Sequence, residues 1–503
     1  MSSRDVRVLL LYPPNQTLPG VMCKPNGSLA YPSLGGSLRR HGIDVAVFDA
    51  CVGDDTDDLN EVFFDRADEL PSGMLRTGVD DERILREAAD YDIVGITSIF
   101  TEQETMVLHC ARIIKEAFPE KILVSGGVNA RSRMPQFFGA GFDVVCLSEA
   151  EETIIEIVRA VRASAGSPDF SAIAGVAWPE PGRIRVNATT SKDMVWDLDT
   201  LPMPAWDLLP NSRYWEIGRP HGGVPGGVLS YSSMVTSLGC PFHCAYCHIA
   251  GEQEGSIAGY IGKYRIKSDE RVLEELDVLK GLGVNQVFIE DDSLLGDKRR
   301  GLRLLRKIRG AGFDIVDVNG INIVHLLKKW KPDHEVLEVL VEAGFSQIAL
   351  PFESANLRIL RKYASNKLNI EKSDIEGLIR ACKDYGIRIM GNYMIGYPDE
   401  TREEIDRTVE LARRHMSYGL DSANFFCVMP LPGTPLFDQA IRDGNLDRDF
   451  NPDMMNFLRA NMRNTIVPAD ELEEIRDRAW EEVNRPEFKA YKRTMVVNPP
   501  TVA

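Results

Sequence analysis

The chain has 503 residues, a length that predicts two or three domains with sizeable hydrophobic cores. Its hydrophobic (44%) and charged (26%) fractions are ordinary for a soluble globular protein. The formal net charge of −17 argues against a nucleic-acid partner, because affinity for nucleic acid comes largely from clustered Lys and Arg. No apolar run is long enough to span a bilayer or to form the core of a signal peptide. We therefore expect a cytoplasmic protein, in which thiols stay reduced and can bind metal.

Residues 1–164 alternate short apolar strands with helices, interrupted by a polar, acidic stretch at 53–69. This alternation predicts an α/β domain with a doubly wound, Rossmann-like (flavodoxin-like) parallel sheet. The expected strands are 6–12, 44–49, 92–98, 121–127 and 143–147, and the expected helices are 32–40, 102–117, 134–138 and about 149–162.

Sheets of this kind bind ligands at the carboxyl ends of their strands. Three loops there carry small or polar residues, namely Thr97-Ser98, Gly126-Gly127-Val128 and Ser148-Glu149. No Gly-x-Gly-x-x-Gly follows the first strand, which disfavours dinucleotide binding. The alternative is a degenerate domain that binds nothing and serves as a scaffold.

Residues 165–225 predict a linker, because Pro, Gly, Asp and Trp are frequent and the strand–helix alternation fades. Segments 172–178 and 184–187 are expected to form a small β-hairpin around a Pro-Gly turn. We expect the rest to be an extended connector.

Cys240, Cys244 and Cys247 fall within eight residues, directly after the apolar run 228–238, which predicts a buried strand. A Gly-Cys-Pro turn ends that run, so the cysteines lie in a loop at the carboxyl end of the strand, where parallel α/β proteins build their sites. Three clustered thiolates can hold a soft metal centre. This spacing would give a four-iron cube three protein ligands and leave one iron open.

Other metal centres are compatible with parts of the same motif. Zinc held by the three thiolates and His243 or His248 is chemically sound. Cys244-Ala-Tyr-Cys247-His248 also matches the c-type haem attachment pattern, which would leave Cys240 unexplained. A purely structural cluster is disfavoured because free thiols this close together on a loop do not serve packing. The remaining cysteines, mostly in apolar runs, are expected to be small buried hydrophobes: Cys23, Cys51, Cys110, Cys146, Cys382 and Cys427.

Residues 226–440 predict six β/α units, which form a partial barrel, since eight units would close it. Residues 441–503 predict a C-terminal helical extension with a charged helix at 469–485. The expected barrel strands are 228–238, 286–290, 314–323, 346–352, 388–395 and 421–428, with helices at 269–282, 298–311, 334–343, 370–385 and 402–416.

The Cys-x3-Cys-x2-Cys spacing, with the aromatic Tyr246 before the third Cys, resembles the radical SAM superfamily. The resemblance implies a [4Fe–4S] cluster on Cys240, Cys244 and Cys247, with S-adenosylmethionine (SAM) on the fourth iron. It also implies SAM contacts at Tyr246 and at three strand ends, and at the first and third of these strand ends helix capping is the structural alternative. These are Glu290, Asp291 and Asp292 near the methionine amino end, Glu353 and Ser354 facing the ribose, and Gly396 and Pro398 near the adenine, with Asp399 at a position usually held by glycine.

The N-terminal domain resembles the cobalamin-binding domain of B12-dependent enzymes. The resemblance places the nucleotide tail of cobalamin against Thr97, Ser98, Gly126-Gly127-Val128 and Ser148-Glu149. Segments 201–206 and 429–435 resemble elements of cobalamin-binding radical SAM enzymes. The histidine loop that supplies a lower cobalt ligand in B12 enzymes is absent, because Pro13-Pro14-Asn15-Gln16-Thr17 follows the first strand. The dimethylbenzimidazole is then expected to be displaced without a replacing histidine.

The resemblance implies a radical SAM enzyme that methylates an unactivated carbon of a small natural-product or lipid-like substrate, with cobalamin as the methyl carrier. A one-electron reductant of the flavodoxin or ferredoxin type is the implied partner. The alternative within the class is a cobalamin-dependent radical cyclase or rearranging enzyme. A non-catalytic zinc- or cluster-binding interaction protein is the alternative from another class. No catalytic residue is predicted beyond the cofactor ligands, and no motif specifies the substrate.

Overall fold

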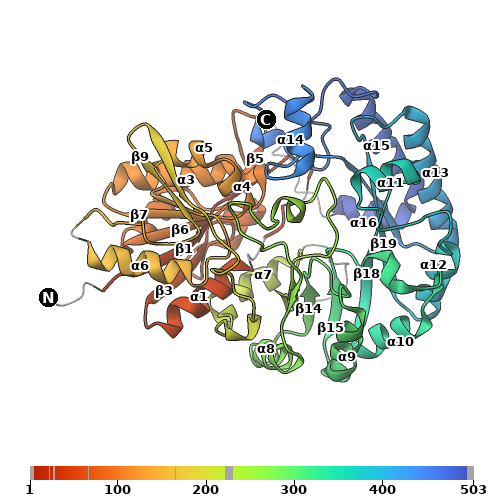
Figure 1. The fold of residues 1–503 in the computed structure, drawn as a ribbon, viewed down its shortest axis with the longest axis horizontal. Helices are drawn as coiled ribbons and strands as arrows, with labels where there is room; N and C mark the ends of the chain where they lie inside the picture. Colours follow the sequence, from red (N-terminus) through yellow and green to blue (C-terminus); the bar gives the residue numbers. More distant parts are fainter. Residues whose placement is uncertain are drawn as a thin grey trace. The chain divides into compact units, whose positions relative to one another are not determined.

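The computed structural model describes residues 5–21, 23–25, 29–65, 67–164, 166–220 and 230–494 (Figure 1). The chain divides into two compact units. Unit 1 comprises Met1–His221, Glu252–Ile261 and Val496–Ala503, and unit 2 comprises Gly222–Gly251 and Gly262–Met495. In the described part of the chain, no helix is both long and apolar enough to cross a membrane.

A seven-stranded sheet organises unit 1. Its five parallel strands, numbered among themselves along the chain, lie in the order 2-1-3-4-5, which is the flavodoxin-like order. This arrangement confirms the fold class predicted for the N-terminal third. In sheet order the five strands are β3 (Asp44–Asp49), β1 (Arg7–Tyr12), β6 (Ile93–Thr97), β7 (Ile122–Gly126) and β8 (Val144–Cys146).

The sheet of unit 1 is buried on both faces because its strands are apolar at successive positions. Along β1, Leu9 and Leu11 belong to one core, while Val8 and Leu10 belong to the other, as the two-residue period of a strand requires. Figure 1 shows helices over both faces of this sheet. The first core is completed by α2 (Asp81–Ala88), α3 (Glu104–Ala117) and α5 (Met134–Gly139), and the second by α1 (Ala30–Arg40) and α6 (Thr153–Ala163).

The predicted hairpin extends the sheet of unit 1. β9 (Val176–Glu180) and β10 (Arg183–Asn187) pair antiparallel, and β9 also pairs antiparallel with β8. Val176 and Ala177 are fully buried, so their side chains are part of the core. Of the predicted linker, residues 165 and 221–225 lie outside the described residues, as do residues 228 and 229 of the predicted first barrel strand.

The acidic stretch that interrupts the first alternation has structure of its own. A small antiparallel sheet joins β2 (Asn15–Thr17), β5 (Leu75–Thr77) and β4 (Asp68–Glu69). A short helix, η1 (Asn60–Phe64), buries Val62 and Phe63. Neither element was expected, because polar residues dominate the local pattern.

Unit 2 is built on six strands whose neighbours are all parallel and whose order in the sheet equals their order in the chain. This is the open, partial barrel that the six β/α units predict. The strands are β11 (Tyr231–Met234), β14 (Gln286–Ile289), β15 (Asp314–Asp317), β18 (Phe345–Glu353), β19 (Arg388–Ile395) and β20 (Ser422–Cys427). The connecting helices are α8 (Asp269–Gly281), α9 (Lys298–Ile308), α10 (His334–Ala343), α12 (Ile375–Asp384) and α13 (Arg402–Tyr418).

Two barrel elements differ from those expected. The third strand, predicted to run to residue 323, ends at Asp317, and Gly320 in the loop that follows has φ +101°. A short helix, α11 (Leu357–Tyr363), follows the fourth strand before α12 begins. Both differences lie at carboxyl ends of strands, where loops build the site.

The C-terminal extension covers β20, the last strand of the barrel sheet. Leu472 and Ile475 of α15 (Ala469–Val483) share a core with Ile395 and Cys427. The Asn484 amide also accepts a hydrogen bond from the backbone N–H of Ala423 (2.9 Å) and donates one to its carbonyl (2.8 Å). This side chain satisfies a backbone pair that an edge strand would otherwise leave open.

We predict that Gly127→Ala destabilises unit 1 by about 1–3 kcal/mol. Gly127 has φ +102°, and a Cβ there would lie 2.5 Å from the carbonyl oxygen of Ser98. Gly139→Ala is the matched control, because a Cβ there meets no atom within 4 Å, and we expect it to stabilise by about 0.4–1 kcal/mol. Urea unfolding measures both. Equal midpoints for the two variants would contradict the prediction.

Candidate active site

The start of the cysteine loop is held by close packing of its backbone against the backbone of residues 262–263. Before the loop, β12 (Ser237–Leu238) pairs antiparallel with β13 (Arg265–Ile266). Gly239 follows with φ +76°, and a Cβ there would lie 2.4 Å from the carbonyl oxygen of Lys263. The Cys240 N–H then donates to the carbonyl of Gly262 (3.2 Å). Only glycine permits this approach, so the first thiol has a defined starting point.

The far end of the loop is held by two other parts of unit 2. The Ala245 N–H donates to the Tyr363 carbonyl at the end of α11 (2.7 Å), and the Ala245 carbonyl accepts from the Leu436 N–H (2.8 Å). A Cβ on Gly251 would lie 2.3 Å from the carbonyl oxygen of Gly433. The segment 429–435, singled out in the sequence, therefore packs against the cysteine loop.

The three thiols form a donor set that suits an iron–sulfur cube. Cys244 is buried, while Cys240 and Cys247 are partly exposed. Burial raises the pKa of all three thiols, and each lies in the electrostatic field of another. Among the described residues, no three His, Cys, Asp or Glu side chains converge tightly enough to hold one metal ion. A cube does not need that convergence, because each thiolate binds a different iron.

Lys367 is a site residue that the sequence did not reveal. Its Nζ donates to Glu353 Oε1 (2.8 Å), and the Tyr246 hydroxyl donates to the same oxygen (2.9 Å). Burial opposes the charge, but the Glu353 carboxylate and the thiols Cys244 and Cys247 raise the pKa of Lys367. A positive charge therefore stands beside the thiols. A single Lys in the loop between α11 and α12 gives no signal that could have identified it.

Glu353 has a strained backbone. It is a non-glycine residue with φ +60°, at a register shift between β18 and β19. Such strain persists only where surrounding contacts determine the conformation, and it concentrates at functional sites. Its carboxylate meets both Lys367 and the predicted SAM contact Tyr246. The neighbouring Ser354 is fully buried, and its Oγ accepts from the backbone N–H of Asn356 (3.2 Å).

The three acids after the second barrel strand connect that strand to the start of the cysteine loop. Glu290 accepts from the Ser233 hydroxyl (2.5 Å), and Asp292 accepts from the Gly239 N–H (2.8 Å). Asp291 is 2% exposed, and it accepts from the Thr236 N–H (2.6 Å), the Thr236 hydroxyl (2.7 Å) and the Ser237 hydroxyl (2.6 Å). These bonds give Asp291 a structural role that the sequence did not indicate. SAM contacts by the three acids remain predictions.

The end of the fifth barrel strand is a tight turn followed by a helix cap. Gly396 has φ +88°, a Cβ there would lie 2.1 Å from Leu472, and its N–H donates to Glu400 Oε2 (2.8 Å). Burial raises the pKa of Glu400 to about 8. Thr401 and Glu404 form a capping box at the start of α13, as the structural alternative predicted. The carbonyl of Pro398 accepts from the Ile466 N–H (3.4 Å).

Asp399, which stands where the radical SAM pattern usually has glycine, is held by polar contacts. It accepts from Arg358 (2.6 Å), Lys362 (2.9 Å) and the Tyr363 hydroxyl (2.7 Å). Burial opposes ionisation, but the hydrogen bonds from Lys362, Tyr363 and Arg358 outweigh it and lower the pKa of Asp399 to about 2. The substitution thus adds an anchor between this turn and α11.

In unit 1, the structure brings the first two predicted cobalamin loops together. The Ser98 N–H donates to the Gly126 carbonyl (2.8 Å), and Gly127 fits closely against the Ser98 carbonyl. The Thr97 N–H donates to the Tyr31 hydroxyl (3.2 Å). Val128 begins α4 (Val128–Ser132), a helix that was not predicted.

A buried polar network supports these two loops. Asn129 Nδ2 donates to Ser98 Oγ and to Glu104 Oε2, both at 3.0 Å, and Arg133 Nε donates to the same Glu104 oxygen (2.6 Å). The Asn129 amide oxygen is buried without a hydrogen-bond partner among the described residues. An amide acceptor left open at this position suits a ligand that donates a hydrogen bond.

The third predicted loop, Ser148-Glu149, follows β8 and lies on the next strand of the sheet. Arg131 of α4 donates to the Leu147 carbonyl (3.4 Å) and pairs with Glu252, so this loop is tied to α4. Two apolar side chains missed by the sequence analysis follow Ser98: Ile99 is 42% exposed and Phe100 is 47% exposed. An apolar surface beside a polar loop suits a large, flat ligand such as a corrin ring.

The loop after β1, which carries no histidine, is tied to the loop after β6. The Gln16 N–H donates to Gln103 Oε1 (2.9 Å), and Gln103 Nε2 donates to the Gln16 carbonyl (2.8 Å). β1 and β6 flank the point where the strand order reverses, which is where open α/β sheets bind ligands.

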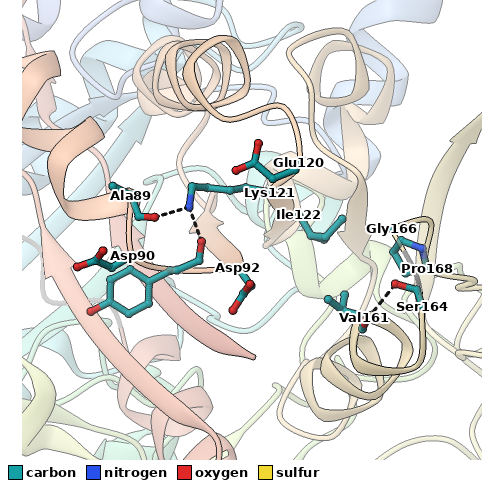
Figure 2. A pocket seen from close by; sticks show the side chains of 11 residues that line it. Ala89, Asp90, Asp92, Glu120, Lys121, Ile122, Val161, Ser164, Gly166 and Pro168 are labelled. Carbon is teal, nitrogen blue, oxygen red and sulfur yellow. Dashed lines mark hydrogen bonds between the residues drawn. The ribbon is translucent and has the colours of Figure 1, made fainter. Parts of the chain in front are cut away.

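A cavity of about 220 Å³ lies at the opposite edge of the same sheet, at the amino ends of β6 and β7 (Figure 2). Lys121 lines this cavity, and its Nζ donates hydrogen bonds to the carbonyls of Ala89 (2.7 Å) and Tyr91 (2.6 Å), as Figure 2 shows. Its charge thus stabilises a chain turn.

Residues 234–412, which include the three cysteines, match the model of the radical SAM superfamily. These residues form a radical SAM domain. An uncharacterized methyltransferase of Pyrococcus horikoshii is 29% identical over 360 residues, which cover 71% of each chain. The cytidylyl-2-hydroxyethylphosphonate methyltransferase of Streptomyces wedmorensis is 26% identical over 407 residues, covering 74% of this chain and 71% of the relative.

Two further likenesses concern the cyclase alternative and the fold. The anaerobic magnesium-protoporphyrin IX monomethyl ester cyclase of Rubrivivax gelatinosus is 24% identical over 385 residues, covering 76% of this chain and 63% of the relative. The radical S-adenosylmethionine methyltransferase TsrM of Kitasatospora setae was solved with cobalamin and a [4Fe–4S] cluster bound. Its TM-score is 0.64 at 17% identity, covering 93% of this chain and 85% of TsrM. That likeness confirms the fold, and the superfamily expected from the cysteine spacing is confirmed as well.

We predict that Glu353 and Lys367 are energetically coupled. Glu353→Gln leaves the Lys367 ammonium buried without its carboxylate, and Lys367→Met leaves the Glu353 carboxylate buried without its ammonium. Each single variant should destabilise the protein by about 3–5 kcal/mol. Glu353→Gln/Lys367→Met should then cost less than the sum of the single changes, by about 1–3 kcal/mol. The exposed pair Arg413–Glu410 is the control, with coupling below about 1 kcal/mol. Additive effects at Glu353 and Lys367 in chemical denaturation would refute the coupling.

Proposed function

We propose that this radical SAM enzyme uses a [4Fe–4S] cluster, SAM and cobalamin to methylate an unactivated carbon of a small-molecule substrate. The observation that carries the proposal is the cysteine loop, in which three thiols are held by backbone contacts at both ends beside a buried cation. Cys240, Cys244 and Cys247 would hold the cluster. When bound, the reduced cluster supplies the electron that cleaves SAM, and the corrinoid supplies the methyl carrier.

The residues around the thiols would bind and orient SAM. Tyr246 is positioned by Glu353, so its ring has a fixed direction from the loop. The Lys367 ammonium is the cation best placed to meet the carboxylate of SAM, because it already stands beside Cys244 and Cys247. Glu290 would accept a hydrogen bond from the SAM amino group, since the Ser233 hydroxyl donates to one of the two Glu290 carboxylate oxygens. Burial of these groups excludes water from the reacting centre.

Cobalamin binding is supported by features of unit 1. The flavodoxin-like sheet places the loops after β6, β7 and β8 on adjacent strands at one edge. Ser98, Gly126 and Gly127 are brought together there, with Ile99 and Phe100 exposed beside them. TsrM, which shares the fold, was solved with cobalamin bound. We propose that Thr97, Ser98, Gly126, Gly127, Val128, Ser148 and Glu149 line the nucleotide tail.

A cobalamin-dependent radical cyclase is the second candidate. It is favoured by the likeness to the anaerobic magnesium-protoporphyrin IX monomethyl ester cyclase, whose sequence this chain matches over 63% of its length. Methyl transfer ranks first because two of the relatives described above carry methyltransferase in their names. In either case the cluster needs one electron for each SAM cleaved, which we propose comes from a carrier of the flavodoxin or ferredoxin type.

We predict that Cys244→Ala abolishes cluster binding and SAM cleavage and leaves unit 1 folded, because the cube loses one of its three protein ligands. Iron and sulfide content of anaerobically reconstituted protein and SAM cleavage measure the effect. Cys382→Ala is the control, because Cys382 is buried in α12 and its substitution removes a thiol without changing the cysteine loop. Retained SAM cleavage in Cys244→Ala would refute the ligand assignment.

Product analysis after anaerobic reconstitution tests the reaction. Methyl transfer predicts a methylated product together with S-adenosylhomocysteine. A cyclase predicts 5′-deoxyadenosine without S-adenosylhomocysteine. An optical spectrum that lacks cluster and corrinoid bands, together with zinc in place of iron, would instead favour the non-catalytic interaction protein.

A further inference from the structure

One surface of unit 2 departs from the acidic character of the chain. Residues 298–309 contain seven Lys or Arg and no Asp or Glu, although the chain as a whole carries a net charge of −17. In the structure, α9, β16 (Leu327–Lys328) and the start of α10 border a groove of about 840 Å³. β16 forms a hairpin with β17 (Lys331–Pro332). We call it the basic groove. Its basic lining residues are Lys298, Arg299, Arg306 and Lys328.

Part of this charge is neutralised within the groove and part is left over. Lys298 pairs with Asp333 (2.8 Å) and Arg306 with Glu335 (2.6 Å). The third acid of the lining, Asp297, caps the amino end of α9. Arg299 and Lys328 are exposed, and neither forms an ion pair with any residue that the structure describes. The surplus positive charge therefore faces solvent.

The basic groove adjoins the segment that contacts the cysteine loop. β16 follows directly after η6 (Ile323–Leu326), and the His325 ring lies 5.9 Å from the Phe242 ring. Phe242 lies between Cys240 and Cys244 in the loop. Burial and the neighbouring Lys298 lower the pKa of His325 to about 4, so this ring adds no charge at neutral pH. A partner seated in the groove would lie near the cluster position without entering the barrel.

We propose that the basic groove is the docking surface for an acidic one-electron carrier protein, with Arg299 and Lys328 as its main electrostatic contacts. The proposal rests on the proposed function, since it requires a cluster that accepts electrons. Charge complementarity selects an acidic partner, because the exposed Arg299 and Lys328 would attract negative charge. Trp330, 45% exposed at the tip of the hairpin, offers an apolar contact beside the charges.

The test measures cluster reduction by stopped flow in anaerobically reconstituted protein, with an acidic bacterial flavodoxin in its fully reduced form as the donor. Arg299→Glu/Lys328→Glu should slow reduction about tenfold at low ionic strength, and the difference should shrink as salt screens the charges. In Arg299→Lys/Lys328→Arg, which keeps both charges, flavodoxin should reduce the cluster at the native rate. Arg112→Glu/Arg478→Glu, which makes the same change in net charge on exposed helix positions, should stay within about twofold of native.

Dithionite, which needs no protein dock, separates the possible failures. The docking surface would be overturned if dithionite reduces all variants equally and Arg299→Glu/Lys328→Glu leaves the rate of cluster reduction by flavodoxin unchanged. Failure of dithionite to bleach even the native protein would instead overturn the cluster and the proposed function. A single-stranded RNA probe whose binding is lost in Arg299→Glu/Lys328→Glu, with flavodoxin reduction unchanged, would assign the groove to nucleic acid and overturn the proposal.

Discussion

Close approach of backbone to backbone fixes the cysteine loop, and the rest of the site depends on it. At Gly239 and Gly251 the chain passes so near to Lys263 and Gly433 that a side chain at either position would collide with a carbonyl oxygen. These crossings hold the loop without using the thiols, which stay available for a cofactor. Precise placement by the surrounding structure is what a site needs when its chemistry comes from a bound group.

Charge is arranged around this loop in a consistent way. The buried acid Asp291 anchors the chain as it enters the loop, and the Lys367–Glu353 pair stands where the loop turns back. The cation beside the thiols offsets part of the negative charge that three thiolates would carry, and it is held by an acid whose own backbone is strained. The surface of the same unit also carries the exposed Arg299 and Lys328, where we propose that an electron donor docks.

Local sequence patterns predicted most of the fold. The five parallel strands of unit 1 and the six of unit 2 were all found from apolar runs, and their alternation with helices determined the class. The sequence missed several short elements, among them the sheet of β2, β4 and β5 and the helices α4 and α11. The expectation that the linker beyond the hairpin is extended was also wrong, because α7 (Asn211–Ile217) forms there and buries Tyr214 and Ile217. The hairpin was found, but its pairing with β8 was not, because pairing between strands far apart in the chain leaves no local signal.

The sequence by itself determined the three thiols, their spacing and their position after a strand, because a loop motif is a property of consecutive residues. It also determined which strand ends carry polar side chains. Only the tertiary structure decided what those side chains do: Asp291 anchors a loop, Asp399 joins α11, and Lys367 reaches the thiols from a loop 120 residues after Cys247. These roles depend on which segments the fold brings into contact, and burial then sets the charge state and hydrogen-bond partners of each group.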